Sequence, residues 1–477
     1  MNKYQTLASN TIVLAIGQFG SKLLVYVMLK FYTSWLGTEG FGDVNNIINA
    51  SSLLISVVTL SISEGVLRYT LDKGNDRRQV FSIGLGVTFV GLVIFAAFVP
   101  LIGFIEMLSS YNWLIFMYVV TGSIKGVCAI YVRARGEVRL YAIDGILTTI
   151  STILLNLLFL GVLKLGVIGY VLSISLGDVI SIIFLFWRAD LFKDIHLFHN
   201  DRMLISAMMR YSIPLMPTTV MWWIINVSDT FMVTGFYGKD ANGIYSFAYK
   251  FPNLAAIVVG IFSQAWHMSA ITERNSRTVS NFYSDVFKMV QTVMFLAAAG
   301  IMLVLRPIIM PFFGGVGFES AYFYVPTLLI AVVFQSFNNF LSSIYEATNK
   351  TTHSFVSSAI GAATNVILNL ILLQTIGVIG AALATFASYM AVYIFRVIDT
   401  KKFLYMKIDH FRIIVNLLLL VGLSGSVMFM EYGVMQNVLN AVIFIVIVAI
   451  NFKTLVRSVK LFISSKRGGE KSEEISE

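Results

Sequence analysis

The sequence predicts an all-α integral membrane protein with about fourteen transmembrane helices. Hydrophobic residues make up 57% of the 477 residues and charged residues only 12%, whereas a soluble domain carries about 25% charged residues. The apolar residues gather in runs of roughly 20, the length that an α-helix needs to cross a hydrocarbon core about 30 Å thick. The polar stretches between the runs are short, so we expect no separate soluble domain.

Fourteen apolar runs are long enough to be membrane spans. Only Lys3 precedes the first run as a basic residue, and no small-residue cleavage site follows that run. We therefore expect an uncleaved first span and not a signal peptide. The expected spans are approximately 11–32, 42–67, 80–104, 112–132, 142–163, 167–187, 211–235, 243–266, 285–305, 322–346, 354–374, 377–396, 412–430 and 437–455.

The distribution of lysine and arginine predicts the orientation of these spans. With the N-terminus placed inside, the inner segments hold 26 of the 34 basic residues, and the outer loops hold three, Lys164, Lys239 and Arg306. By the positive-inside rule, both termini then lie in the cytoplasm. The net charge of +9 is thus a topology signal, and we expect no nucleic-acid partner.

Two sequence elements recur at nearly the same distance along the chain, which predicts an internal repeat. The first span is followed by "GTEGFG" (37–42) and the seventh by "GKDANG" (238–243); both have the form G-x-acid-x-x-G, 201 residues apart. Later, "LNLLFLGVLKLGVIG" (155–169) is echoed by "LNLILLQTIGVIG" (368–380). Six spans separate the two halves, so both start inside and the repeats are parallel.

The repeat predicts the domain organisation. Residues 1–200 are expected to form an N-terminal six-helix bundle and residues 201–400 a C-terminal six-helix bundle. Residues 401–460 add two transmembrane helices. Residues 461–477 are polar and low in complexity, which is typical of a disordered tail, here on the cytoplasmic side.

Two of the seven prolines stand at the start of the second bundle, in "RYSIPLMP" (210–217). Pro214 lies in the first turn of the expected helix, where a proline removes no hydrogen bond. Pro217 lies deeper, where it removes a backbone bond and is expected to kink the helix. Simple helix initiation is the alternative to a bent helix that lines a cavity between the halves.

No motif for covalent chemistry occurs in the sequence. It contains no phosphate-binding G-x-x-x-x-G-K-[ST], no H-E-x-x-H and no paired cysteines. The single cysteine, Cys128, lies in an apolar run and fits a small buried residue. We therefore expect neither an enzyme nor a metal site nor a cofactor.

Basic residues within the spans are candidates for substrate binding, because a charge is costly in hydrocarbon and is seldom placed there without a role. Lys22 and Lys125 lie at mid-depth in spans 1 and 4, and Lys250 lies in the outer part of span 8. In one interpretation they are structural ion pairs, such as Lys22 with Asp178. In the other they face a central aqueous cavity and hold an anionic group such as a phosphate, which cannot enter hydrocarbon bare.

Acidic and amide side chains complete the candidate site. Asp178, Asp229 and Glu64 lie in spans 6, 7 and 2 and are candidates for coupling to H⁺ or Na⁺, or for counter-charges. Amide groups suit sugar hydroxyls, although they serve equally well as hydrogen-bond partners between helices. The amide candidates within the spans are Asn226, Gln264 and Asn338.

These features together resemble the polysaccharide and O-antigen flippases of bacteria, within the multidrug/oligosaccharidyl-lipid/polysaccharide exporter superfamily. The resemblance rests on the "RYSIPLMP" segment, the two G-x-acid-x-x-G turns and the twin "GVIG" elements at Gly166 and Gly377. It covers about residues 1–455. It implies two six-helix bundles around a central cavity and transport by alternating access.

The resemblance also implies a cargo and a setting. The cargo is an oligosaccharide on undecaprenyl diphosphate, moved from the inner to the outer leaflet of the cytoplasmic membrane of a bacterium during surface polysaccharide biosynthesis. Membrane lipids, a polysaccharide polymerase and glycosyltransferases are the implied partners. Spans 13 and 14 are expected to form a groove for the lipid tail, and Lys22, Lys125 and Lys250 match the basic cavity residues of the family by depth.

Two other functions compete with the flippase. A cation-coupled multidrug antiporter of the same superfamily would have a cavity dominated by acids, whereas three lysines lie within these spans. A membrane glycosyltransferase or polymerase would carry a sizeable loop outside the membrane. The longest internal loop here is about 23 residues, from Arg188 to Arg210, and has nothing typical of a nucleotide-sugar site.

Overall fold

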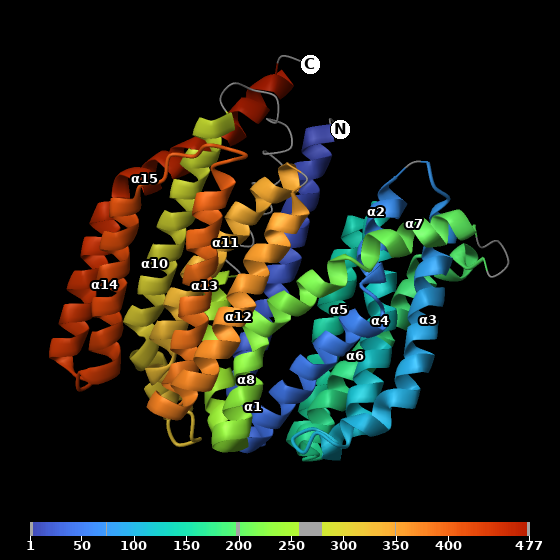
Figure 1. Ribbon diagram of the computed structural model, residues 1–477, viewed down its shortest axis with the longest axis horizontal. Coiled ribbons are helices and arrows are strands. Elements are labelled where there is room, and N and C mark those ends of the chain that lie inside the picture. Colours follow the sequence, from blue (N-terminus) through green and yellow to red (C-terminus); the bar gives the residue numbers. More distant parts are fainter. Residues whose placement is uncertain (1–2, 73, 197–200, 257–278, 349, 475–477) are drawn as a thin grey trace. The chain divides into compact units, whose positions relative to one another are not determined.

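The computed structural model describes the backbone of residues 3–72, 74–196, 201–256, 279–348 and 350–474. Side chains are described over the same ranges apart from 3–23, 279, 282, 346–347, 351 and 457–474. Within these ranges the chain is helical and contains no strand (Figure 1). The all-α fold class predicted from the sequence is therefore confirmed.

Many of the described helices can cross a membrane. Ten are long and apolar enough by length and composition, and the bent pair Leu24–Val58 and Ile62–Leu71 makes an eleventh. The expected span at 211–235 falls within a more polar helix, and the one at 243–266 runs beyond the described residues. The protein is thus a multi-pass membrane protein.

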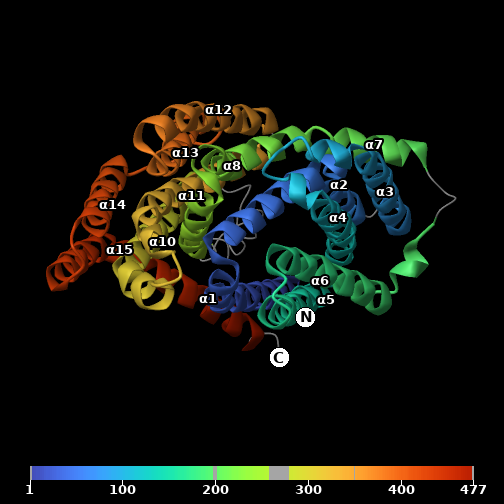
Figure 2. The same ribbon diagram turned by 90° about the horizontal axis from the view of Figure 1, so that it is seen from below.

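The chain divides into two compact units, Met1–Ser246 and Phe247–Glu477. In the first unit α4, α5 and α6 pack side by side (Figure 2), and α1 packs on all three. The helices of this unit, the last of which ends two residues beyond it, are α1 (Lys3–Val58), α2 (Ile62–Leu71), α3 (Arg77–Ile102), α4 (Asn112–Ala134), α5 (Val138–Asn156), α6 (Gly166–Arg188), α7 (Arg202–Ser212) and α8 (Leu215–Ala248).

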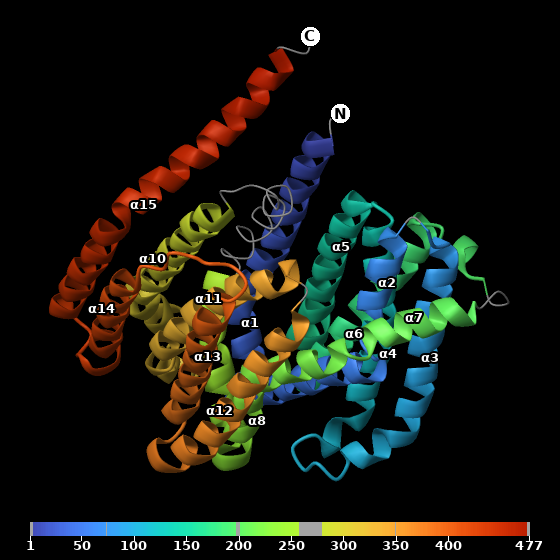
Figure 3. The ribbon, with the colours of Figure 1, turned by 45° about the horizontal axis from the view of Figure 1, so that its top comes forward.

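In the second unit α13 packs against both α11 and α12. The two additional helices, α14 and α15, lie side by side (Figure 3) and pack on α10. Arg412 at the start of α14 fixes this contact through hydrogen bonds to Thr292 of α10 and Asn451 of α15. The helices are α10 (Val279–Phe313), α11 (Val325–Ala347), α12 (Thr351–Ile376), α13 (Ile379–Thr400), α14 (His410–Phe429) and α15 (Val434–Glu474).

Helix α15 extends further than the sequence suggests. It runs to Glu474, into the polar range 461–477 whose composition predicts disorder. Lys, Arg and Glu are good helix formers, and extending an existing helix adds one hydrogen bond for each residue fixed. Composition alone does not register this effect of the preceding span.

The repeated glycines adopt the same backbone conformations in both halves. Gly37 (φ 65°, ψ −174°) interrupts α1 and Gly238 (φ 84°, ψ 177°) interrupts α8. Gly166 and Gly377 also have positive φ, 56° and 79°. A residue with a Cβ pays for this conformation and glycine does not, so the internal repeat extends from sequence to turn geometry.

Span 2 is broken at a point that the sequence does not mark. Leu60 and Ser61 have φ values of 50° and 53°, and the axes on either side of them differ by 57°. A positive φ is uncommon in residues other than glycine and stores strain. Across the break, α3 comes so close that a Cβ on Gly91 would clash with the carbonyl oxygen of Val58.

The two prolines of "RYSIPLMP" flank a helix start. Helix α7 ends at Ser212, and Pro214 lies in the turn before α8 begins at Leu215. Pro217 is the third residue of α8, where its missing N–H would have had no partner within the helix. The change of direction thus comes from the turn at 213–214 and not from a proline deep in α8.

Candidate functional site

Lys125 and Asp178 form an ion pair inside the first unit. Lys125 lies on α4 and Asp178 on α6, and the Nζ–Oδ1 distance is 2.7 Å. The Asp178 side chain is 7% exposed and that of Lys125 24%. The structure thus brings together two of the residues selected from the sequence, and the lysine keeps part of its surface open.

A second buried carboxylate lies beside this pair. Asp144, near the start of α5, is 2% exposed and accepts a hydrogen bond of 2.6 Å from the Ser181 hydroxyl on α6. Ser181 lies one helical turn after Asp178. Two carboxylates and one lysine therefore lie close together where α4, α5 and α6 pack, an arrangement that the sequence analysis did not identify.

The other acidic candidates of the first unit lie elsewhere. Asp229 on α8 is fully buried and accepts a hydrogen bond of 2.8 Å from the Tyr245 hydroxyl. Glu64 is exposed in the first turn of α2. Asn226, on α8, donates to the Trp222 carbonyl one turn earlier. These three candidates are not gathered around Lys125 and Asp178 by any contact described above.

Asn338 belongs to a packed polar contact in the second unit. Its amide donates to the Tyr389 carbonyl (2.9 Å), and its own carbonyl accepts from Arg396 (2.6 Å). The contact joins α11 to α13, which is the interhelical role left open for the amides. Lys250 lies half-buried just after α8. The Lys22 side chain and all of Gln264 lie outside the described residues.

The two G-x-acid-x-x-G turns pack against each other within the first unit. A Cβ on Gly42 would clash with the carbonyl oxygen of Lys239, and a Cβ on Gly243 would clash with that of Thr38. Thr38 and Lys239 are the second residues of the two motifs. The contact is therefore reciprocal, as expected for two copies of one element related by an approximate two-fold axis.

Side chains of both motifs add polar bonds to this contact. The Thr38 hydroxyl donates to Asp240 (2.5 Å), and Lys239 lies 3.0 Å from Asp43. Asp43 is 4% exposed and also accepts a hydrogen bond of 2.8 Å from Tyr111. We call the contact formed by Thr38, Gly42, Asp43, Lys239, Asp240 and Gly243 the turn latch.

A row of hydrogen bonds continues from the turn latch along α1 and α8. Asn46 donates to Thr234 (3.0 Å) and accepts from Asn242 (2.9 Å). One turn further, Asn49 donates to Thr230 (3.3 Å). Interhelical bonds of this kind in membranes are worth about 0.6 kcal/mol each on average, so the row holds the helices together without making the contact irreversible.

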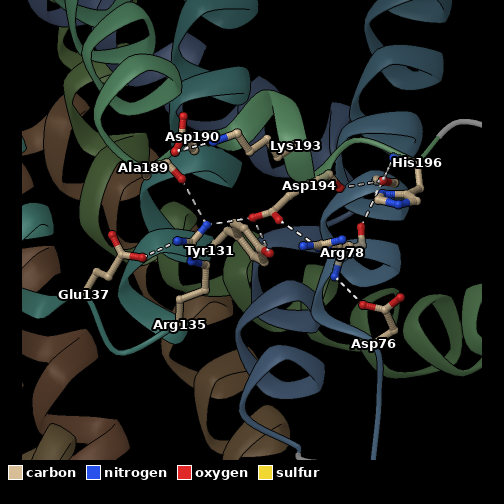
Figure 4. Close-up of polar contacts among 11 residues, drawn as sticks. Asp76, Arg78, Tyr131, Arg135, Glu137, Ala189, Asp190, Lys193, Asp194 and His196 are labelled. Atoms are coloured by element: carbon tan, nitrogen blue, oxygen red, sulfur yellow. Dashed lines mark hydrogen bonds and ion pairs between the residues drawn. The ribbon is translucent and has the colours of Figure 1, made fainter.

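A cluster of charges joins the ends of α3, α4 and η3 (Leu191–Asp194) on the side predicted to be cytoplasmic (Figure 4). Asp194 lies at its centre. It accepts from Arg135 (2.6 Å) and Tyr131 (3.0 Å) and lies 3.3 Å from Arg78. Burial alone would lower the pKa of Arg135, but the carboxylates of Glu137 and Asp194 raise it above the ordinary value, so its charge is permanent.

The second unit repeats the tyrosine–aspartate part of this cluster. Tyr345 on α11 donates to Asp399 near the end of α13 (2.9 Å). His353 and Lys402 lie 2.7 and 2.9 Å from the same carboxylate. Each unit thus carries an aspartate at the end of its sixth expected span, held by a tyrosine from its fourth. We call these pairs the tyrosine–aspartate staples.

Comparison with known proteins gives the same picture. The family model described as "Polysaccharide biosynthesis protein" matches residues 7–267, more than half of the chain. The chain belongs to this polysaccharide biosynthesis family. An uncharacterized membrane protein of Methanocaldococcus jannaschii is 23% identical over 427 residues, which cover 83% of this chain and 99% of that protein.

Solved transporters share the fold of this family member. The inward closed structure of the lipid II flippase MurJ matches with a TM-score of 0.70 and 17% identity over 93% of this chain and 100% of that one. An inward-facing multidrug resistance MATE transporter matches with a TM-score of 0.65 and 16% identity, over 80% of this chain and 98% of that one. The chain therefore has the transporter fold of the superfamily that the sequence resembles.

Proposed function

We propose that this protein is a flippase that moves an undecaprenyl-diphosphate-linked oligosaccharide from the inner to the outer leaflet for surface polysaccharide biosynthesis. The observation that carries the proposal is the match to the polysaccharide biosynthesis family on a chain with a flippase-like transporter fold. The proposed setting is the cytoplasmic membrane of a bacterium, with both termini inside. A polymerase and glycosyltransferases are the proposed partners.

Lys125 is the proposed contact for the diphosphate. Its ammonium is the one selected cation whose partner and exposure are both described, and part of its surface stays open beside Asp178. An anionic headgroup that arrives at Lys125 would take over the position of the aspartate. Asp178 would then accept a proton or another cation, so that substrate and counter-ion exchange at one lysine. Lys22, Lys250, Asn226, Gln264 and Asn338 stay candidates for further contacts.

The turn latch supports alternating access. It closes α1 on α8 at the end predicted to be outside, using a reciprocal backbone contact and two polar bonds. Opening this end would separate Lys239 from Asp43 and Thr38 from Asp240. The latch residues are hydrophilic and can exchange these bonds for bonds to water. Such a contact suits a gate that opens and closes.

A cation-coupled multidrug antiporter is the second candidate. It is favoured by the two buried carboxylates Asp144 and Asp178 around one lysine and by the fold shared with MATE transporters. In that function a cationic drug would compete with Lys125 for Asp178. H⁺ or Na⁺ would then be the coupling ion.

Deletion of the gene in its host tests the proposal. Lipid-linked oligosaccharides and surface polysaccharide are measured together, and a plasmid supplies the wild type or the Lys125→Ala variant. The flippase predicts complete lipid-linked units on the inner leaflet and loss of surface polymer, restored by the wild type only. Unchanged polysaccharide with new sensitivity to cationic drugs would favour the antiporter. Incomplete units would favour an enzyme.

A further inference from the structure

An apolar groove runs along α3 in the first unit and has no part in the function proposed above. Seventeen residues of α1, α3, α7 and the break between α1 and α2 line a volume of about 690 Å³. Val90, Ile94 and Phe98 are 58%, 55% and 55% exposed, so the groove opens to the outside along a membrane-spanning helix. Its residues are those of α3 from Ser82 to Ile102, with neighbours on the other elements.

The chemistry of the lining decides what can fill the groove. Ser82 is its one polar side chain, and the hydroxyl is already engaged: it donates to Arg78 and Asp194 carbonyls and accepts from the His196 N–H. A bound water needs two to four polar partners, which this lining does not offer. The groove therefore excludes water and suits a hydrocarbon chain.

The volume decides between the hydrocarbon chains of a membrane. At about 30 Å³ for a water-sized group, 690 Å³ holds a chain of some twenty small groups. This is the size of one phospholipid acyl chain, whereas an undecaprenyl chain has far more carbon atoms. We propose that an acyl chain of a bilayer phospholipid occupies this groove as a bound lipid.

The groove also has a structural consequence for span 2. Val58 and Leu60, at the strained break, form part of its wall. A chain in the groove would contact the break where no helix covers it, adding apolar contact worth about 25 cal/mol per Å² buried. The bound lipid would thus stabilise the bent form of span 2. This role is independent of the transported substrate.

Gly86 offers a way to fill the groove without disturbing the core. It lines the groove, and a Cβ there would meet nothing within 4 Å. Gly86→Leu therefore places a side chain in the lipid's position. Gly145→Leu on α5 is the matched control, since Gly145 is exposed, has equally open space and lies outside the groove. Val90→Trp is a second filling variant, should Gly86→Leu fail to fold.

The test uses the full-length protein in vesicles of phosphatidylglycerol that carries a photoreactive diazirine in one acyl chain. Adducts are mapped by peptide mass spectrometry. We expect labelling of the groove face of α3 several-fold above that of the exposed Ile146 and Ile150 on α5, lost in Gly86→Leu or Val90→Trp and kept in Gly145→Leu. Equal labelling of both faces, or labelling unchanged by the filling variants, would overturn the proposal. Preferential labelling by a diazirine-bearing undecaprenyl diphosphate instead would also overturn it and assign the groove to the cargo.

Discussion

The Nζ atom of Lys239 lies 3.0 Å from the Oδ2 atom of Asp43, so a residue of the second glycine motif is paired with the residue that directly follows the first. The two motifs lie 201 positions apart in the sequence, yet they meet at one contact. Their repetition is thus more than a trace of duplication. The two copies are each other's binding surface.

The packing of the turn latch predicts a sharp difference between glycines. Gly42→Ala and Gly243→Ala each force a Cβ against a carbonyl oxygen of the other turn, and overpacking of this kind costs about 1–3 kcal/mol. Gly235→Ala, in open space on α8, should leave stability nearly unchanged. Melting of the purified proteins in detergent checks this. Equal melting temperatures for all three variants would contradict the reciprocal contact.

A cross-link across the turn latch should stop transport. In Thr38→Cys/Asp240→Cys the two thiols would take the places of side chains whose polar atoms lie 2.5 Å apart, while the native Cys128 is buried. If this end must open, oxidation should abolish transport and reduction should restore it. Each single cysteine variant is the control. Full transport by the quantitatively cross-linked protein would show that the latch is not a gate.

The Lys125–Asp178 pair separates a structural from a functional role. Lys125→Ala leaves a buried carboxylate without its cation, a loss of about 3–5 kcal/mol for a buried pair. The exchange Lys125→Asp/Asp178→Lys should recover much of this stability. If Lys125 binds the substrate anion, the exchanged protein should still fail to transport. Recovery of both stability and transport would assign the pair a purely structural role.

The tyrosine–aspartate staples should matter in both units. Tyr131→Phe and Tyr345→Phe each remove one hydrogen bond to a buried carboxylate, for which we expect a loss of about 1.5–3 kcal/mol. Asp190→Asn, which breaks the exposed pair with Lys193, should change stability by less than about 1 kcal/mol. Chemical denaturation followed by tryptophan fluorescence measures the differences. Losses confined to one unit would contradict the repeat of the staples.

Glu319 predicts a small dependence of stability on pH. Its carboxylate accepts a hydrogen bond of 2.6 Å from the Gly315 N–H, and backbone hydrogen bonds lower its pKa in the folded protein. Because the folded pKa is the lower one, this stabilisation is present above the unfolded value of about 4.3 and is lost as the pH falls through the folded value. The fall in melting temperature from pH 7 to pH 4 should be smaller in Glu319→Gln than in the wild type. An identical fall would refute the effect.

Periodicity and glycine signals carried most of the fold. The apolar runs located α3 to α6 and α10 to α14 to within a few residues. The glycine motifs predicted the turns at Gly37 and Gly238. The break at Leu60 and Ser61 was missed because no proline or glycine marks it. There, contact with α3 at Gly91 accompanies a conformation that the local sequence does not favour.

The candidate site was less accessible from sequence. Depth in a span selected Lys125 and Asp178 but could not show that they pair, because which helix faces meet is a tertiary property. Asp43, Asp144 and Asp194 were not selected, since they lie near expected span ends, where charges are ordinary. Their partners come from residues distant in the chain. One signal was available: Asp240 is the acid of its own repeated motif.

The flippase function is tested most directly with purified protein in vesicles. A lipid-linked oligosaccharide on undecaprenyl diphosphate is placed in both leaflets, and a lectin or a glycosidase added outside reports how much becomes accessible over time. We predict accessibility of the inner pool with the wild type, and neither with empty vesicles nor with Lys125→Ala. Wild-type protein, correctly inserted and folded, that leaves the inner pool protected would contradict the proposed function.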